Sequence, residues 1–295
     1  MNISAITVIK PNKFALIALL LSSIALSAQT LQSYQKQQAQ SQLNRIEELL
    51  KRQKREYATG LTKTAAQTCA VIIAIDPKNL RAYKDRAYYL GLAGDFNGQI
   101  ETIKDAMRLA PQDLWLYECL GCAYSNHGFH LEAAKAYSQC IRIAPDKSTY
   151  RINRGLDYLD AGQYDKALVD FNDIIASEPS NYYGYRNRGW LRECQNDFSS
   201  AIADYNQAHK VAPQMHYIFK DLHRVHNKSG QFELALMDAN QAIKRSPVTA
   251  EGYYLRALTK LKMQDLKGAR SDLNQCIKFK LHPQAAATLR NSLNQ

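Results

Sequence analysis

A 34-residue spacing of prolines constrains this 295-residue chain more than any other feature. The prolines in register are Pro77, Pro111, Pro145, Pro179, Pro213 and Pro247. A glycine recurs in step with them, at Gly60, Gly94, Gly128, Gly162 and Gly230, with Asn196 in the one internal gap. A fixed period of this size indicates stacked supersecondary units rather than one globular core. Stacked units present a long surface that commonly binds other chains.

Each interval between prolines contains two amphipathic stretches, divided by the glycine. In residues 114–143, apolar side chains such as Leu116 and Leu120 recur at three- and four-residue steps, which is the helical period. Gly128 suits a chain reversal because glycine adopts positive φ without steric cost. Pro145 ends the second helix because proline has no amide donor. The sequence therefore predicts a repeated helix–turn–helix unit.

The third interval carries the residues of a known repeat pattern. It reads Tyr117-x-x-Leu120-Gly121-x-x-Tyr124, followed by Ala133, Tyr137 and Pro145. This pattern resembles the tetratricopeptide repeat, which has the same period. The resemblance implies an all-α, right-handed α-solenoid of about seven repeats, with residues 284–295 as a C-terminal capping helix. With the prolines at repeat position 32, the repeats are 46–79, 80–113, 114–147, 148–181, 182–215, 216–249 and 250–283.

Small residues recur at two further positions of the repeat. Position 8 is small at Ala87, Gly121, Gly155, Gly189 and Ala257. Position 20 is alanine in every repeat except the second, where it is Gln99. We expect the two positions to face each other, so that the two helices of a repeat can approach closely. Position 8 departs from the pattern as Gln53 and His223.

The first 28 residues differ from the repeats. Lys10 and Lys13 precede an uncharged run, Phe14–Ala28, that ends in small residues. A run of this length is typical of a signal peptide and falls short of the roughly 20 residues of a spanning helix. An uncleaved membrane anchor stays as the alternative, and in either case we expect repeats outside the cytoplasm, in the periplasm if the source is bacterial. Residues 29–45 are polar and glutamine-rich and predict a tether or a helical extension.

The net charge of +11 could attract several classes of partner. A basic solenoid that binds nucleic acid or an anionic surface is therefore one alternative function. Acidic residues are interleaved with the basic ones along the chain, which favours an ordinary solvated surface. We therefore expect protein or peptide partners rather than nucleic acid, with membrane contact only through an uncleaved N-terminal segment.

Two clusters could carry chemistry. Cys119 and Cys122 are the close pair among six cysteines and could form a disulfide or a redox pair. His223 and His226 lie three apart on one helix, but a metal site would need further ligands. We interpret both clusters as residues packed in the core. A thiol- or metal-dependent activity is kept as a second alternative function. The sequence predicts no enzyme, no catalytic or metal residue and no cofactor.

An arginine and an aspartate recur together in the later repeats. Position 23 is Asp170, Asp204, Asp238 and Asp272, and each is followed two residues later by asparagine. Position 7 is Arg154, Arg188 and Arg256, with Leu222 in the sixth repeat. We expect structural Arg–Asp ion pairs between the two helices, within or across repeats, supported by the asparagine. Partly buried pairs of this kind fix geometry more than they add stability.

The resemblance also implies a binding groove. Ligands of tetratricopeptide repeats usually lie on the concave surface, along positions 2, 5, 9, 12 and 13 of the first helix. Here these positions give Arg81, Lys84, Tyr88, Trp115, Glu118, Asn126, Tyr183, Arg186, Trp190, Glu193, Tyr217, Lys220, Arg224, Lys228, Tyr254 and Lys262. Exposed aromatic residues are characteristic of binding hot spots. We expect an extended or helical peptide with apolar anchors and acidic or carboxylate ends.

Overall fold

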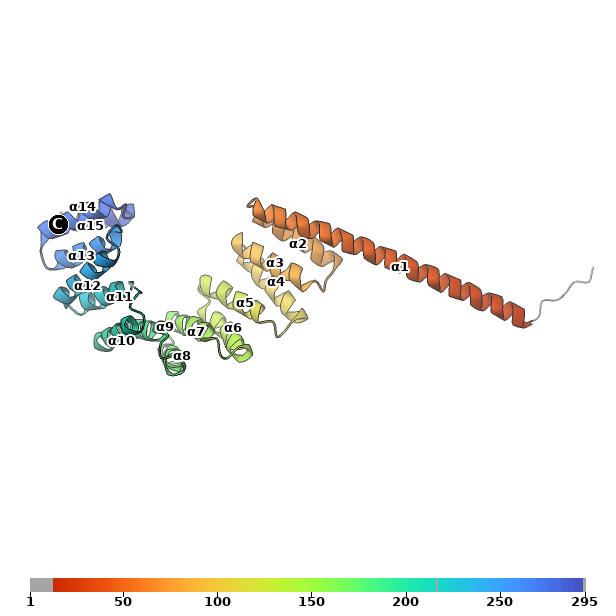
Figure 1. The fold of residues 1–295 in the computed structure, drawn as a ribbon, viewed down its shortest axis with the longest axis horizontal. Coiled ribbons are helices and arrows are strands. Elements are labelled where there is room, and N and C mark those ends of the chain that lie inside the picture. The colour runs from red at the N-terminus through yellow and green to blue at the C-terminus, as the bar shows by residue number, and fades with distance from the viewer. Residues whose placement is uncertain (1–12, 216, 294–295) are drawn as a thin grey trace, which may run out of the picture. The chain divides into compact units, whose positions relative to one another are not determined.

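The computed structural model describes residues 13–215 and 217–293, with side chains from residue 27 onward. Within these ranges the chain forms fifteen α-helices and no strand, packed as consecutive pairs (Figure 1). The chain divides into an N-terminal unit, Met1–Pro111, and a C-terminal unit, Gln112–Gln295. The N-terminal unit contains α1 (Lys13–Ala58), α2 (Thr62–Ile75), α3 (Leu80–Leu92) and α4 (Phe96–Leu109). The C-terminal unit contains α5 (Leu114–Asn126), α6 (His130–Ile143), α7 (Ser148–Asp160), α8 (Tyr164–Ser177), α9 (Tyr182–Cys194), α10 (Phe198–Val211), α11 (Ile218–Lys228), α12 (Phe232–Arg245), α13 (Ala250–Lys262), α14 (Leu266–Lys278) and α15 (Pro283–Ser292).

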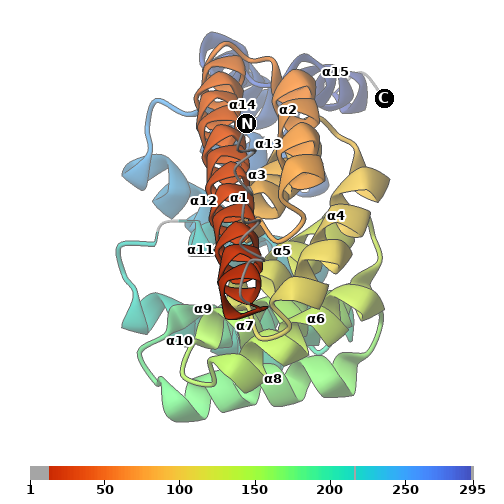
Figure 2. The same cartoon turned by 90° about the vertical axis from the view of Figure 1, so that its right-hand side faces the viewer.

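The first helix is longer than a repeat helix, and its C-terminal part lies beside α2 (Figure 2). Residues 29–45 belong to this helix and are exposed throughout, so the predicted tether is a helical extension. Burial begins at Ile46, which packs with Ile72 and Ala82. Most of the predicted signal or anchor segment, residues 1–28, lies outside the residues whose side chains are described. Among residues 27–215 and 217–293, no helix is long and apolar enough to cross a membrane.

The turns inside the hairpins have the conformation expected from their glycines. All five glycines of the 34-residue series have φ between +70° and +79°. Asn196, which fills the gap in that series, has φ of +63°. Gln264 takes the same turn position in the seventh repeat, with φ of +60°. The left-handed region is costly for residues with a Cβ, so the hairpin geometry overrides the local preference of glutamine.

Aspartates start several of the second helices. The side chains of Asp95, Asp197 and Asp265 precede α4, α10 and α14 and each accepts a hydrogen bond from the amide three residues later. Each carboxylate therefore satisfies one of the amides that a helix start leaves without an intrahelical partner. These caps, with the prolines at the far ends, fix the bounds of the hairpins.

The core of the hairpins in the third, fourth and fifth repeats depends on a size match between position 8 of the first helix and position 24 of the second. A Cβ added to Gly121, Gly155 or Gly189 would lie 2.6–3.0 Å from the ring of the aromatic residue at position 24. The sequence analysis paired position 8 with position 20, and the ring at position 24 fills the same space: a Cβ on Gly189 would also lie 3.3 Å from the carbonyl oxygen of Ala201 at position 20. The pairs are Gln53/Cys69, Ala87/Ile103, Gly121/Tyr137, Gly155/Phe171, Gly189/Tyr205, His223/Ala239 and Ala257/Leu273.

Candidate functional site: the groove of α9, α11 and α13

The predicted arginine–aspartate pairs lie between the two helices of one repeat. Arg188 of α9 donates two hydrogen bonds to Asp204 of α10, at 2.8 and 2.9 Å. Its third bond, at 2.7 Å, goes to Asn172 in the preceding repeat. Arg154 and Arg256 bind in the same way to Asp170 and Asp272, and reach back to Ser138 and Asn240. These arginines fix the spacing of the helices that form the groove.

A second cation, at position 11, completes two of these sites. Arg192 approaches Asp204 to 2.8 Å, and Lys260 approaches Asp272 to 2.9 Å. The carboxylates are almost fully buried, so each of them needs such partners to offset its loss of hydration.

The sixth repeat departs from this scheme. Leu222 replaces the arginine, and Asp238 instead accepts a hydrogen bond from Nδ1 of His226 at 2.6 Å. Burial raises the pKa of the Asp238 carboxyl, and the hydrogen bond from His226 opposes that rise. The predicted histidine cluster is thus split, with His226 facing α12 and His223 facing α13.

A cavity at the predicted binding positions lies over α9, α11 and α13, and has a volume of about 1110 Å³. We call it the α11 groove. Its lining contains five cationic and two acidic side chains, three leucines and two tyrosines. The lining residues are Tyr183, Arg186, Tyr217, Lys220, Asp221, His223, Arg224, Asn227, Lys228, Glu251, Leu255, Leu258, Leu261, Lys262 and Ser292.

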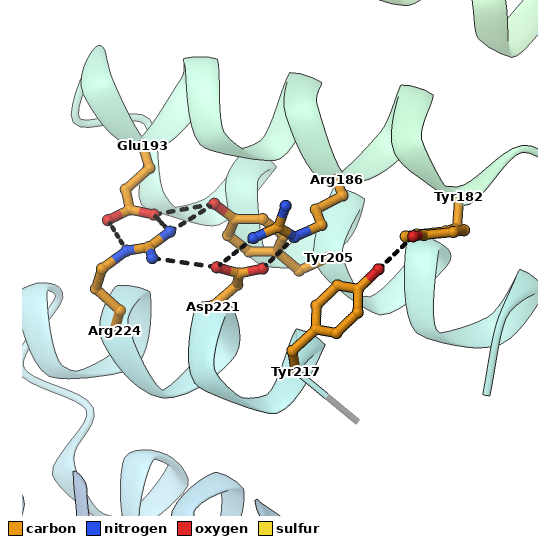
Figure 3. Close-up of polar contacts among 7 residues, drawn as sticks. All are labelled: Tyr182, Arg186, Glu193, Tyr205, Tyr217, Asp221 and Arg224. Carbon is orange, nitrogen blue, oxygen red and sulfur yellow. Dashed lines mark hydrogen bonds and ion pairs between the residues drawn. The ribbon is translucent and has the colours of Figure 1, made fainter. Parts of the chain in front are cut away.

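A buried carboxylate, Glu193 of α9, anchors one side of the groove (Figure 3). Arg224 donates to both of its oxygens at 2.8 Å, and the hydroxyl of Tyr205 donates to it at 3.0 Å. Lys228 adds an ion pair at 2.9 Å. Although burial alone would raise the pKa of Glu193, the hydrogen bonds from Arg224 and Lys228 lower it below its ordinary value. Glu193 was predicted as a partner contact, but at 2% exposure it positions the cations around it.

Asp221 of α11 forms the second anchor. Nε of Arg186 donates to it at 2.6 Å, and Nη1 of Arg224 lies 3.1 Å from it (Figure 3). The guanidinium of Arg186 also lies 5.1 Å from the ring centroid of Tyr217, whose hydroxyl bonds that of Tyr182. Arg186 and Arg224 thus join α9 to α11, and both side chains line the groove.

The side of the groove that α13 forms contains three leucines, which we call the leucine wall, together with Glu251 and Lys262. The leucines are Leu255, Leu258 and Leu261. The sequence prediction missed these leucines, although Leu258 and Leu261 occupy repeat positions 9 and 12. The α11 groove therefore has one cationic wall and one leucine wall.

Two smaller cavities adjoin the α11 groove and share Arg186 with it. One of about 640 Å³ lies toward α7 and is lined by Ile152, Leu156 and Tyr183 among others. The other, of about 340 Å³, is lined by Trp190 and Glu193. The exposed fractions of Tyr183 and Trp190 are 43% and 37%, so both rings are accessible.

The remaining predicted contacts lie elsewhere. Arg81, Lys84 and Tyr88 are on α3 of the N-terminal unit, where the hydroxyl of Tyr88 lies 3.2 Å from that of Tyr57. Trp115, Glu118 and Asn126 are on α5, and Glu118 accepts a hydrogen bond from Tyr150. Tyr254 packs on the cluster around Leu289 instead of lining the groove.

The groups that could carry chemistry are placed as packing residues. His223 is buried, its Nε2 lies 2.8 Å from the Thr259 hydroxyl, and burial lowers its pKa to about 4. None of the six cysteines is in a disulfide, and Sγ of Cys122 lies 3.2 Å from the hydroxyl of Tyr137. Among the described residues, no group of three or more His, Cys, Asp or Glu side chains is placed to hold a metal ion.

Consecutive helical hairpins, with a groove on the first helices of neighbouring hairpins, define the α-solenoid repeat class. Residues 152–215 and 250–282 match tetratricopeptide repeat models. The chain is 28% identical over 131 residues to human tetratricopeptide repeat protein 6. The matched region covers 44% of this chain and 25% of that protein. It is 29% identical over 73 residues to small glutamine-rich tetratricopeptide repeat-containing protein 2 of Saccharomyces cerevisiae, covering 25% and 21%. The chain thus spans about a quarter or less of the length of these relatives.

Solved structures with the same fold cover more of the chain. A tetratricopeptide repeat protein from Parabacteroides merdae has a TM-score of 0.66 at 16% identity, covering 85% of this chain and 99% of that one. PilW, a type IV pilus biogenesis factor, has a TM-score of 0.59 at 19% identity, covering 71% and 97%. At these identities the likeness shows the fold alone, which is the predicted α-solenoid.

Proposed function

We propose that this chain is a non-enzymatic scaffold that binds a segment of a protein partner in the α11 groove. The observation that carries the proposal is the groove itself. It combines accessible tyrosines, cations and a leucine wall in a cavity of about 1110 Å³. Recognition sites for chain segments combine apolar anchors with a few polar groups that fix orientation. Repeat solenoids commonly use their long surface in this way.

We further propose that the repeats act outside the cytoplasm, either exported or tethered by the N-terminal segment. Support comes from Lys10 and Lys13 before the apolar run Phe14–Ala28. PilW, which shares the fold, is a pilus biogenesis factor, and a role in assembly at the cell envelope would suit a scaffold of this kind. The mass of the mature protein, with fractionation of the cells, tests this part of the proposal.

Photo-crosslinking in the native cell tests the binding proposal. A photoreactive residue replaces Tyr183, which lines both the α11 groove and the cavity beside α7. The matched control replaces Lys166, an exposed residue of α8. We expect one discrete protein to be captured from position 183 and not from position 166. Equal capture from both positions would contradict binding in the groove.

A further inference from the structure

The acidic side chains of the α11 groove and of the adjoining cavity that Glu193 lines are held in unequal ways. Asp221 and Glu193 are buried, at 3% and 2% exposure, and each is bound by two cations or more. Glu251, in the first turn of α13, has a side chain that is 52% exposed and pairs with Lys220 of α11. The first two carboxylates are fixed parts of the fold. Glu251 differs from them because its carboxylate stays hydrated when its ion pair with Lys220 breaks.

The energetics of ion pairs separate these groups further. A buried pair is costly to break because the remaining charge stays desolvated. An exposed pair adds little, because water solvates both of its members once they separate. An incoming carboxylate can therefore take Lys220 from Glu251 at small cost, whereas Arg186 and Arg224 stay committed to Asp221 and Glu193.

The cations and leucines of the groove set the spacing of a ligand. Lys220 and Lys228 both line the cavity on α11, and eight residues of helix span about 12 Å. Four residues of extended chain cover about 13 Å, and alternate side chains of such a chain point to opposite sides. A segment with acidic residues at positions i and i+4 would take Lys220 with one carboxylate and approach Lys228 with the other, while Lys228, whose side chain is 53% exposed, keeps its ion pair with Glu193. Its residues i+1 and i+3 would face the leucines of α13.

The direct contact between α11 and α13 favours an extended segment over a helix that would lie between them. His223 of α11 and Thr259 of α13 are in contact, with Nε2 and Oγ1 2.8 Å apart. Because α11 and α13 are in contact at this point, a helix of about 10 Å diameter cannot pass between them there.

Resting on the proposed function, we propose that Glu251 is an internal competitor for the ligand. In the free groove it holds Lys220, and an acidic, apolar-alternating segment of the partner displaces it. The groove thus selects ligands that carry their own carboxylates, since a neutral segment leaves the Lys220–Glu251 pair in place. A ligand therefore binds Lys220 only if its own carboxylate competes successfully with that of Glu251.

Two fluorescein-labelled peptides test the inference by fluorescence anisotropy. The acidic probe is Ser-Asp-Leu-Ser-Leu-Asp-Ser, and the neutral probe has asparagine in place of both aspartates. We expect Glu251→Gln to bind the acidic probe about two- to fivefold more tightly than the native protein, the range for one exposed ion pair. The affinity for the neutral probe should not change. Glu132→Gln, which removes an exposed carboxylate on α6 and shifts the net charge equally, should match the native protein.

Lys220→Gln supplies the second arm of the test. It should weaken binding of the acidic probe and abolish the gain from Glu251→Gln when the two changes are combined. Equal affinity of native and Glu251→Gln protein for the acidic probe would overturn the inference. So would an equal gain in Glu132→Gln, or a failure of the acidic probe to bind at all. The proposed function would survive these results, because crosslinking from position 183 does not depend on the charge of the ligand.

Discussion

Gly155 of α7 and Phe171 of α8 share a single space in the fourth repeat. A Cβ on Gly155 would lie 2.6 Å from Cε1 of the Phe171 ring, well inside van der Waals contact. The seventh repeat solves the same packing problem with Ala257 and Leu273, which lie in one hydrophobic cluster. Close packing of this kind makes the two positions interdependent.

Gly155→Ala should therefore lower the free energy of unfolding by about 1–3 kcal/mol, the usual cost of overpacking. Without the ring, the same change inside a helix would stabilise by about 1 kcal/mol, so the sign of the effect identifies the clash. Adding Phe171→Leu should recover most of the loss, because the shorter side chain makes room for the methyl group. Urea denaturation of the two single variants and the double variant measures this coupling. Additive effects would contradict it.

Asp204→Ala should lower the free energy of unfolding by about 1–3 kcal/mol, because it leaves Arg188 and Arg192 without their shared carboxylate. Asp204→Asn keeps one acceptor for the arginines and should cost less. Thermal unfolding followed by circular dichroism is the measurement. An unchanged melting temperature of Asp204→Ala would show that these bonds do not stabilise the fold.

His223 should make the C-terminal unit sensitive to acid. Its pKa falls from 6.5 to about 4 on folding, so the folded state binds its proton less readily than the unfolded state does. The contribution of His223 is fully present above pH 6.5 and is lost as pH falls toward 4, by about 3 kcal/mol in total. Asp157 and Asp238 act in the opposite sense, because burial raises their pKa values.

A variant isolates the histidine from these carboxyls. Glutamine occupies the equivalent position of the first repeat, as Gln53, so His223→Gln is the conservative choice. The difference in unfolding free energy between native protein and variant should shrink between pH 7 and pH 4.5. If urea denaturation gives the same difference at both pH values, the burial of a neutral His223 is refuted.

The cysteines should divide into reactive and protected groups. Burial raises the pKa of Cys69 and Cys140 to about 12 and that of Cys276 to about 11, so these thiols hold almost no thiolate near neutral pH. Cys122 and Cys194 are exposed. Brief treatment with iodoacetamide should label the exposed pair in the folded protein and all six cysteines in urea. Rapid labelling of Cys140 without denaturant would contradict the packing of that repeat.

The hairpins could be predicted from the sequence because local chemistry decides them. Prolines end helices and glycines take the left-handed turn, and both act within a few residues. Gln264 was missed as a turn residue because its conformation is imposed by the packing of α13 on α14. Similarly, the size match of Gly155 with Phe171 depends on how the ring points between helices, which the 34-residue period does not encode.

The groove was predicted in part. The cations of α11 follow from their repeat positions, but the burial of Glu193 depends on Tyr205 and Arg224, which reach it from two other helices. The leucine wall contains Leu258 and Leu261, which the same positional rule would have identified. The ion pairs of the α11 groove, such as Lys220–Glu251, could not be predicted. They depend on distances between side chains of different helices, which no spacing in the sequence determines.

Leu222, which stands at position 7 of the sixth repeat in place of an arginine, changes how that repeat is linked to the fifth. At three other junctions, an arginine at position 7 donates a hydrogen bond to a residue of the preceding repeat, which is Ser138, Asn172 or Asn240. The Leu222 side chain has no donor, and at that junction the ion pairs between α9 and α11 include Arg186–Asp221, Arg224–Glu193 and Lys228–Glu193, whose cations line the groove. The fifth and sixth repeats are thus linked by ion pairs whose arginines also belong to the proposed binding surface. A ligand that touches those arginines would change the bending stiffness of the array at the place where it binds.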